Sequence, residues 1–293
     1  MMERTTAIVT GANRGIGLFT ALALAERGME VVLVGRDPAR IEAARRFVAE
    51  RAERAQKGES GSLFTALADF SSLEEVRRLA DALLRAHPRI SLLVNNAGIM
   101  SRRFRRSAEG YELTFAVNHL APFLLTNLLL DRLKASAPAR ILTVASEAHR
   151  GARLDLSLID APKPFAILKA YGRSKLCNIL FTRELSLRLA GTGVVAAALH
   201  PGVVATGIAD QGGLVGLGWR LAKPFMLSPE KGAETSVFLA TTPDPAPFAG
   251  AYVVGRAAVE PDPAARDQGL ARRLWEESAR LTGLSGPLRS RQG

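Results

Sequence analysis

The chain has 293 residues, of which 47% are hydrophobic and 23% charged, the composition of a soluble globular protein. A single cysteine, Cys177, excludes an internal disulfide and so a secreted disulfide framework. The net charge of +11 is compatible with nucleic acid, anionic lipid or a phosphorylated ligand. The basic residues are spread over helix-like segments, so we interpret them as solvated helix faces and expect no nucleic-acid partner.

The sequence indicates neither a signal peptide nor a membrane-spanning segment. The opening MMERTTAIVTGANRG is charged and reaches a glycine too early for the apolar core of a signal peptide. The uncharged segment 113–130 is close to the length of a membrane span, but its asparagines, histidine and proline would be costly in lipid. We therefore expect a buried helix there, no transmembrane anchor and a cytoplasmic protein.

Short apolar runs alternate with amphipathic segments along the chain. The runs predict strands at 7–9, 31–34, 62–67, 91–94, 140–144, 194–199 and 251–254. The segments between them predict helices at 17–28, 38–56, 73–86, 111–134, 169–190 and 230–242. Continuous apolar runs are typical of parallel strands buried on both faces. The pattern predicts one α/β domain over 1–293, a Rossmann-type doubly wound parallel sheet of about seven strands with helices on both faces.

Several helix starts are marked by polar residues. Asp37 precedes Pro38, which predicts an N-cap followed by proline at the first helical position. Ser72 stands three residues before Glu75, the spacing of a capping box. Ser228 repeats the first device before a proline.

The first strand runs into TGANRGIG at 10–17, where Gly11, Gly15 and Gly17 mark a strand-to-helix turn. Glycine permits positive φ and close approach of backbone to a ligand. The helix amino terminus then offers free N–H groups and a positive dipole to a phosphate. The spacing G-x-x-x-G-x-G favours a nucleotide-binding turn, with an ordinary tight turn as the alternative.

The end of the second strand favours NADP(H), with NAD(H) as the other option. An NAD site usually offers a carboxylate there, whereas a 2′-phosphate calls for arginine. Gly35 stands where the acid is expected, Arg36 follows it, and Arg14 in the glycine turn can reach the same phosphate. Asp37 is the alternative ribose acid, but its place before Pro38 explains it better as a helix cap.

Two further loops follow the carboxyl ends of strands, where open α/β sheets bind ligands. Asp69, in ADF after the third strand, is suited to accept a hydrogen bond from an adenine amino group. A simple loop acid at a helix start is the alternative. NNAG at 95–98 is small and polar, and so suited to lie against a cofactor ribose.

Tyr171 and Lys175 stand four residues apart in AYGRSKLCN. On a helix they share one face. A nearby ammonium group favours the phenolate and lowers the pKa of a tyrosine, which makes it a usable proton donor or acceptor near neutral pH. The alternative is an incidental pair on a solvated helix face.

Together these motifs resemble the short-chain dehydrogenase/reductase family over residues 5–255. The resemblance is carried by TGANRGIG, the Asp69 loop, NNAG, Asn118, Ser146, Tyr171-x-x-x-Lys175 and PGVVAT at 201–206. Within the family, NNAGIM, GYELTFAVNHLAPFLLT and the long gap from Ser146 to Tyr171 resemble the retinol dehydrogenase-type branch.

The resemblance implies hydride transfer between NADP(H) and a lipophilic aldehyde, ketone or alcohol, retinoid-, steroid- or lipid-carbonyl-like. It implies that Tyr171 exchanges the proton and that Lys175 lowers the pKa of Tyr171 and binds the nicotinamide ribose. Ser146 would hold the substrate oxygen where charge develops. Asn118 would support a water next to Lys175. The alternative function is a non-catalytic scaffold or sensor that binds NADP(H).

The expected cofactor site combines several loops with the catalytic pair. Its residues are Gly11, Asn13, Arg14, Gly15, Ile16, Gly17, Arg36, Asp69, Phe70, Asn95, Ala97, Gly98, Tyr171, Lys175, Pro201, Gly202, Val204 and Thr206. No metal site is expected, because His87, His119 and His200 lack metal-ligand spacing. His149 lies near Ser146, but the G-x-S-x-G elbow of a hydrolase is absent.

Three features depart from the family pattern. Ala145 replaces a second serine that the retinol dehydrogenase-type branch usually has. Ala121 and Pro122 replace a glycine-containing pair, and the proline is expected to kink the helix. RRFRR at 102–106 either attracts an anionic substrate or is a solvated loop, which is the favoured interpretation.

The last third of the chain carries the expected substrate elements. Residues 207–230 are rich in glycine and large apolar residues, and the resemblance implies a substrate lid. Such a lid suits a lipophilic substrate, and could also touch a membrane surface or pack on the domain. Residues 262–293 are expected to be a helical extension whose helix LARRLWEESARL covers the substrate cleft. The resemblance also allows a homodimer through helices around 111–134 and 169–189.

Overall fold

The computed structural model describes residues 5–55, 61–158, 165–202 and 227–284. The strands are β1 (Thr6–Thr10), β2 (Glu30–Gly35), β3 (Leu63–Leu67), β4 (Ile90–Asn95), β5 (Ala139–Val144), β6 (Val194–His200), β7 (Tyr252–Val254) and β8 (Ala257–Ala258). The main helices are α1 (Gly15–Ala25), α2 (Pro38–Ala55), α3 (Leu73–Ala86), α4 (Leu113–Phe115), α5 (Ala121–Ala135), α6 (Ile167–Arg188), α8 (Pro229–Thr241), α9 (Pro263–Arg266) and α10 (Gln268–Leu281).

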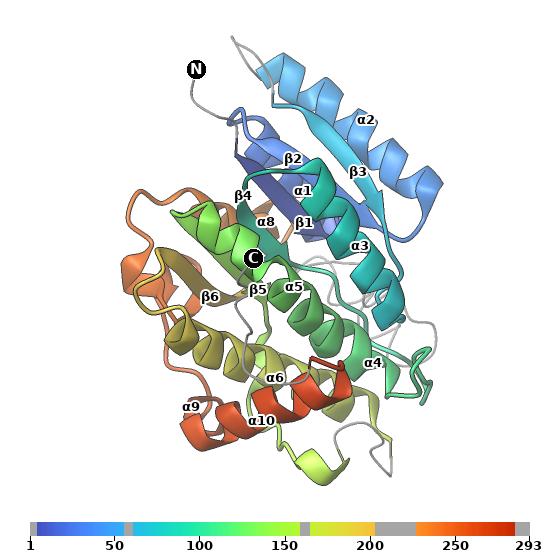
Figure 1. Ribbon diagram of the computed structural model, residues 1–293, viewed down its shortest axis with the longest axis vertical. Coiled ribbons are helices and arrows are strands. Elements are labelled where there is room, and N and C mark those ends of the chain that lie inside the picture. The colour runs from blue at the N-terminus through green and yellow to red at the C-terminus, as the bar shows by residue number, and fades with distance from the viewer. Residues whose placement is uncertain (1–4, 56–60, 159–164, 203–226, 285–293) are drawn as a thin grey trace, which may run out of the picture.

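The strands form one sheet in the order β3-β2-β1-β4-β5-β6-β7-β8 (Figure 1). The first seven run parallel, and β8 pairs antiparallel with β7. The predicted doubly wound α/β fold is thus confirmed. The strand order reverses between β1 and β4, and such a switch point opens a ligand-binding crevice at the carboxyl ends of the strands.

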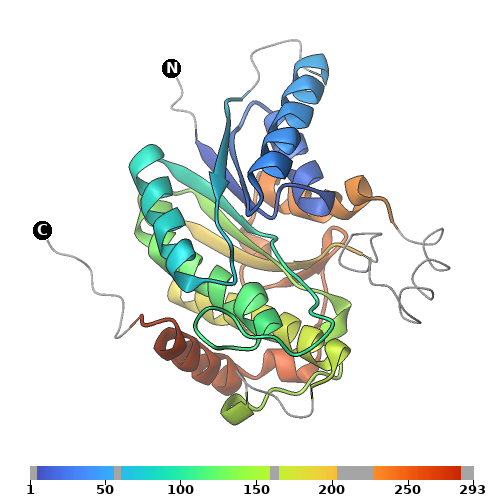
Figure 2. The same ribbon diagram turned by 90° about the vertical axis from the view of Figure 1, so that its right-hand side faces the viewer.

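Helices cover both faces of the sheet, as Figure 2 shows in side view. Successive side chains of a strand point to opposite faces. On β1, Ala7 and Val9 therefore join the core beneath α1, α2 and α8, while Ile8 joins the core beneath α3, α5 and α6. All five residues of β1 are buried, as expected for a central parallel strand.

The edge strand β3 differs from the expectation of burial on both faces. Phe64 is 42% exposed and Leu67 is 51% exposed. β3 is the terminal strand of the sheet, with only β2 as its neighbour. Its apolar run does not distinguish it from a central strand, so the sequence interpretation was wrong on this point.

Two of the predicted helix caps are present in full. The Oδ1 of Asp37 accepts a hydrogen bond from the main-chain N–H of Arg40 over 3.0 Å at the start of α2. The Oγ of Ser228 accepts from the N–H of Lys231 over 3.3 Å at the start of α8. Asp37 is therefore a cap residue.

The predicted helix over 111–134 is divided into α4, a π-helical turn η1 (Ala116–Leu120) and α5. Pro122 lies in the first turn of α5. Proline has no N–H to donate to the carbonyl four residues earlier. The π-helical turn, in which the regular hydrogen-bond pattern of the helix changes, ends two residues before Pro122. The segment Leu113–Ala135 is long and apolar enough to cross a membrane, but 89% of its most apolar window is buried. It is a core helix, as predicted.

The helix α10 packs on α5 and α6 (Figure 1). The ring of Trp275 lies 5.0 Å from that of Phe123 and 5.8 Å from that of Phe181, and the guanidinium group of Arg188 lies 4.3 Å from it. Phe181 and Arg188 lie on α6 and follow Tyr171 by 10 and 17 residues. The apolar stripe of α10 packs on α5 and α6. That α10 covers the substrate cleft stays a prediction.

Candidate active site

The glycine turn between β1 and α1 leaves no room for side chains at Gly11 and Gly17. Gly11 and Gly15 have positive φ values of 66° and 59°. A Cβ on Gly11 would lie 2.9 Å from the Cα of Ala97, and one on Gly17 would lie 2.5 Å from the carbonyl oxygen of Gly11. Side chains here would close the turn, so the glycines keep backbone N–H groups at the start of α1 within reach of a phosphate.

The NNAG loop after β4 is fastened to the glycine turn. The Oγ1 of Thr10 accepts hydrogen bonds from the N–H groups of Asn96 and Ala97, each over 3.0 Å. The side-chain amide of Asn96 donates to the carbonyl oxygen of Thr10 over 2.7 Å. Thr10 and Asn96 are therefore the residues that set the position of this loop. Sequence reasoning did not select either one, although both stand inside the quoted motifs.

The side chain of Asn95 points away from the predicted cofactor position. It is 4% exposed, and its amide donates to the Oγ1 of Thr126 on α5 over 2.9 Å. Phe70 is likewise 7% exposed and belongs to the core beneath α3 and α5. Both side chains therefore pack inward, and the predicted roles of Asn95 and Phe70 in the cofactor site stay predictions.

Arg14 and Arg36 lie on adjacent loops, and both are exposed. The N–H of Ala12 donates to the carbonyl oxygen of Val34 over 3.1 Å, which joins the glycine turn to the end of β2. A Cβ on Gly35 would lie 3.0 Å from a methyl carbon of Ile41 and 3.6 Å from the Cβ of Asn13. The position expected to hold a ribose-binding acid in an NAD enzyme is thus tight against Ile41.

Asp69 shapes the loop between β3 and α3. Its Oδ1 accepts from the N–H of Ser71 over 2.9 Å, and its own N–H donates to the Oε2 of Glu75 over 2.7 Å. The Oγ of Ser72 accepts from the N–H of Glu75 over 3.4 Å. One of the two hydrogen bonds of the predicted capping box is thus present. The other is replaced, because the Glu75 carboxylate accepts from the N–H of Asp69 rather than from that of Ser72. The role of Asp69 toward adenine stays a prediction.

Ser146 and Tyr171 meet between the end of β5 and the start of α6. Ser146 caps the 3-10 turn η2 (Glu147–His149), and its Oγ accepts from the N–H of Ala148 over 3.2 Å. Since the oxygen accepts there, the hydroxyl proton is available to a partner on the other side. Ser146 also makes a side-chain hydrogen bond with Tyr171.

Lys175 lies one turn further along α6, on the face of Tyr171, as predicted. Its Nζ is 5.6 Å from the centre of the Tyr171 ring and donates to the carbonyl oxygen of Val144 over 2.8 Å. Burial lowers the pKa of Lys175 to about 8. Burial raises the pKa of Tyr171 to about 12, and the hydrogen bond with Ser146 opposes this increase. The expected lowering of the Tyr171 pKa by Lys175 is not found, because desolvation is the dominant cause and the ammonium group turns toward Val144.

Asn118 connects the NNAG loop to α6. Its Oδ1 accepts from the N–H of Ile99 over 2.8 Å, and its Nδ2 donates to the carbonyl oxygen of Ile99 over 2.9 Å and to the Oγ of Ser174 over 3.0 Å. A Cβ on Gly98 would lie 3.3 Å from the Asn118 Oδ1 and 3.6 Å from the Lys175 Nζ. The Asn118 side chain is therefore engaged in fixing the loop beside Lys175.

The loop after β6 begins at the same edge of the sheet. Pro201 and Gly202 follow β6, and Gly202 has a positive φ of 84°. Val204, Thr206 and most of the expected lid lie outside the described residues, which resume at 227. Their predicted roles are not tested by the structure.

The site as a whole consists of a glycine cradle at a helix amino terminus, a small polar loop fastened to it, and a serine, tyrosine and lysine beside that loop. The family described as short chain dehydrogenase matches residues 5–213. The chain belongs to this family and is one of its oxidoreductases.

The curated relatives place it in the retinol dehydrogenase-like branch. It is 42% identical over 295 residues to retinol dehydrogenase 13 of Homo sapiens, covering 96% of this chain and 86% of that one. It is 45% identical over 287 residues to dehydrogenase/reductase SDR family member 13 of Bos taurus, covering 96% and 74%.

Solved structures agree with the fold. A protein from Mycobacterium paratuberculosis superposes with a TM-score of 0.78 at 34% identity, covering 98% of this chain and 96% of that one. A metagenomic short-chain oxidoreductase solved in complex with NADP superposes with a TM-score of 0.63 at 25% identity, covering 87% and 98%.

Proposed function

We propose that the protein reduces a lipophilic aldehyde or ketone with NADPH, and that it runs the reverse oxidation when the cofactor ratio allows. The observation that carries the proposal is the grouping of Ser146, Tyr171 and Lys175 beside a glycine cradle that a Cβ would fill. A non-catalytic NADP(H)-binding scaffold has no need of three such side chains together.

The cofactor supplies the hydride when bound, and the side chains control the proton and the developing charge. The Tyr171 hydroxyl donates its proton to the substrate oxygen, and the Ser146 hydroxyl donates a hydrogen bond to the same atom. The raised pKa of Tyr171 keeps its proton in place until the oxygen becomes basic. Lys175, with a pKa lowered to about 8, is positioned to return a proton to this group and to bind the nicotinamide ribose.

A route for that proton is suggested by Pro122. Proline has no N–H, so the main-chain carbonyl of Asn118 lacks the usual donor four residues later. This carbonyl is therefore suited to accept from a water beside Lys175. The Asn118 side chain is already hydrogen-bonded to Ile99 and Ser174. The predicted water would therefore be bound by the main-chain carbonyl of Asn118.

The cofactor preference rests on charge at the end of β2. Arg14 and Arg36 are exposed on adjacent loops and together suit a 2′-phosphate. Gly35 offers no carboxylate and has Ile41 directly against it. A solved relative was captured with NADP, which fits the same preference.

The substrate class rests on the relatives and on composition. Several of the similar proteins are named as retinol dehydrogenases, which favours a retinoid-like, steroid-like or lipid carbonyl. The apolar segment 207–230 suits such a substrate as a lid, with contact to a membrane surface as an additional role. We place the protein in the cytoplasm, and its pairing as a homodimer stays a prediction.

The test is NADPH oxidation by purified protein over aldehydes and ketones of increasing chain length and ring content, with NADH run in parallel. The proposal expects turnover that prefers NADPH and rises with substrate hydrophobicity. Binding of NADPH without turnover of any carbonyl would favour the scaffold instead.

A further inference from the structure

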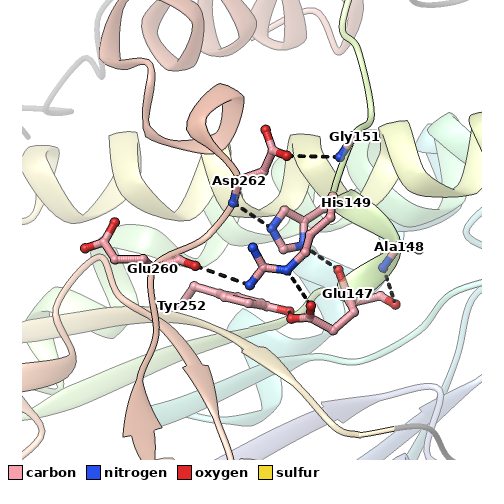
Figure 3. A network of polar contacts seen from close by, with 9 residues as sticks. Glu147, Ala148, His149, Gly151, Tyr252, Glu260 and Asp262 are labelled. Atoms are coloured by element: carbon pink, nitrogen blue, oxygen red, sulfur yellow. Dashed lines mark hydrogen bonds and ion pairs between the residues drawn. The ribbon is translucent and has the colours of Figure 1, made fainter.

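A histidine that the proposed reaction does not use holds the turn after Ser146. The His149 side chain is fully buried, and its Nδ1 lies 2.7 Å from the main-chain carbonyl oxygen of Ser146. On the other side of the ring, the main-chain N–H of Asp262 donates to Nε2 over 3.1 Å (Figure 3). His149 thus connects the Ser146 turn to the segment that begins the C-terminal helices.

These two contacts select one tautomer of the imidazole. A carbonyl oxygen can only accept a hydrogen bond, so Nδ1 must carry the proton. A main-chain N–H can only donate, so Nε2 must present its lone pair. The neutral Nδ1–H form of His149 satisfies both partners, and the Nε2–H form satisfies neither. The N–H of Asp262 therefore keeps the histidine proton directed at Ser146.

The surroundings hold both partners in place. The carboxylate of Asp262 accepts from the N–H of Gly151 over 3.0 Å and from that of Ala264 over 2.9 Å. The ring of Tyr252 meets His149 edge to face at 4.9 Å. The Tyr252 hydroxyl donates to Glu147, the residue after Ser146, over 2.8 Å. Figure 3 shows the resulting network between the η2 turn and the C-terminal segment.

We propose that His149 is a positioning residue for the Ser146 hydroxyl and that the main-chain N–H of Asp262 sets its tautomer. This inference rests on the proposed function and adds a residue to it. The N–H of Ala148 holds the Ser146 Oγ, and His149 holds the Ser146 carbonyl. With both oxygens fixed, the serine proton is directed to Tyr171 and the substrate oxygen. His149 itself touches neither of the reacting groups.

A matched pair of variants isolates the single N–H group. Asp262→Ala and Asp262→Pro both lose the carboxylate, but only proline also loses the N–H. The φ of Asp262 is −51°, which proline adopts without strain. We expect Asp262→Pro to have a kcat for carbonyl reduction about tenfold below that of Asp262→Ala, the size of one buried hydrogen bond. The KM for NADPH should be equal in the two variants.

The Asp262 variants are also compared in a protein that carries His149→Asn, to distinguish an effect on the histidine tautomer from an effect on folding. An asparagine amide places a donor nitrogen near the Nδ1 position and has no tautomers, so it needs no help from Asp262. We expect His149→Asn to retain most of the wild-type kcat and His149→Phe to lose it. In the His149→Asn background, the difference between the Asp262→Pro and Asp262→Ala variants should vanish. A tenfold difference that persists there would overturn the inference.

A spectroscopic measurement decides the tautomer without any substrate. The chain contains four histidines, so the ¹⁵N signals of His149 can be assigned by their loss in His149→Asn. We expect the Nδ1–H form in wild type and in Asp262→Ala. In Asp262→Pro we expect a smaller share of this form, since the Ser146 carbonyl alone then favours it. An Nε2–H form in wild type would overturn it, whether or not a carbonyl is reduced. Equal kcat values for the two Asp262 variants in an active enzyme would overturn it and leave the proposed function standing.

Discussion

Gly172 on α6 lies directly against the main chain of Ala148 in the turn after Ser146. A Cβ on Gly172 would stand 2.4 Å from the carbonyl oxygen of Ala148, a distance that no real contact adopts. The absence of a side chain at this position lets the start of α6 approach the turn, and this approach brings Tyr171 to Ser146. Gly172 therefore contributes to the site although it carries no functional group.

Gly172→Ala should lower kcat by about a hundredfold, because a displacement near 1 Å at reacting groups costs that much. Binding of NADPH should change little, since a Cβ on Gly172 would meet atoms of Ala148 and Ala152 and none of the glycine turn. Gly269→Ala in α10 is the control, because its Cβ would meet only side-chain atoms of Arg273 and Asp267 at 3.3 Å. Steady-state kinetics of the two variants would decide, and equal kcat values would contradict the account.

Arg36→Ala should raise the KM for NADPH by roughly ten- to a hundredfold and leave that for NADH nearly unchanged. The reason is the loss of one charge-assisted hydrogen bond to the 2′-phosphate. Arg46→Ala is a suitable control, since Arg46 is an exposed residue of α2 that pairs with Glu42 over 3.2 Å. Equal losses with both cofactors would exclude the proposed role of Arg36.

The stability of the protein should fall in acid partly through His119. Burial lowers the pKa of His119 to about 3, from an ordinary value of 6.5. Between pH 6.5 and 3 the unfolded chain binds a proton that the folded protein does not, so the free energy of unfolding falls as the pH falls. The contribution is about 1.4 kcal/mol for each pH unit in this window.

His119→Gln removes this titration and can still reach the Ser278 Oγ, which lies 2.8 Å from the His119 Nε2. Urea unfolding at pH 7, 5.5 and 4.5 should therefore show a smaller loss of stability for the variant than for wild type. Parallel losses across these pH values would mean that His119 does not titrate in this way.

Trp275→Ala should destabilise the protein by about 3–5 kcal/mol, the cost of removing a large aromatic side chain from a packed core. Trp275 is 7% exposed and contacts Phe123, Phe181 and Arg188. Leu187→Ala is the control, because Leu187 is 56% exposed on α6 and should change stability by less than about 0.5 kcal/mol. Chemical denaturation measures both, and a small effect for Trp275 would mean that α10 is not part of the core.

The fold could be predicted from sequence because its strands are continuous apolar runs between marked helix starts. All seven predicted strands are present. β8 was missed because it has only two residues, Ala257 and Ala258, too few to show a strand pattern. The π turn was anticipated only as a kink at Pro122, since the helical period does not reveal how a missing N–H is accommodated.

The site was predicted less completely, because its geometry depends on contacts between distant segments. The Ser146, Tyr171 and Lys175 side chains do come together. The contact of the Asn95 side chain with Thr126 was not predicted, because which of two neighbouring side chains faces the core cannot be inferred from the motif alone. Gly172 was missed because its partner, Ala148, lies 24 positions earlier in the chain.

The central claim is that Tyr171 transfers the proton during NADPH-dependent reduction of a carbonyl. Tyr171→Phe removes the hydroxyl and keeps the buried ring, so NADPH binding should be retained. We predict that the rate of carbonyl reduction falls at least about a thousandfold in this variant, within the range expected for loss of a general acid. The Kd for NADPH should change by less than about threefold. A Tyr171→Phe enzyme that still reduces the same substrate at a comparable rate would contradict the central claim.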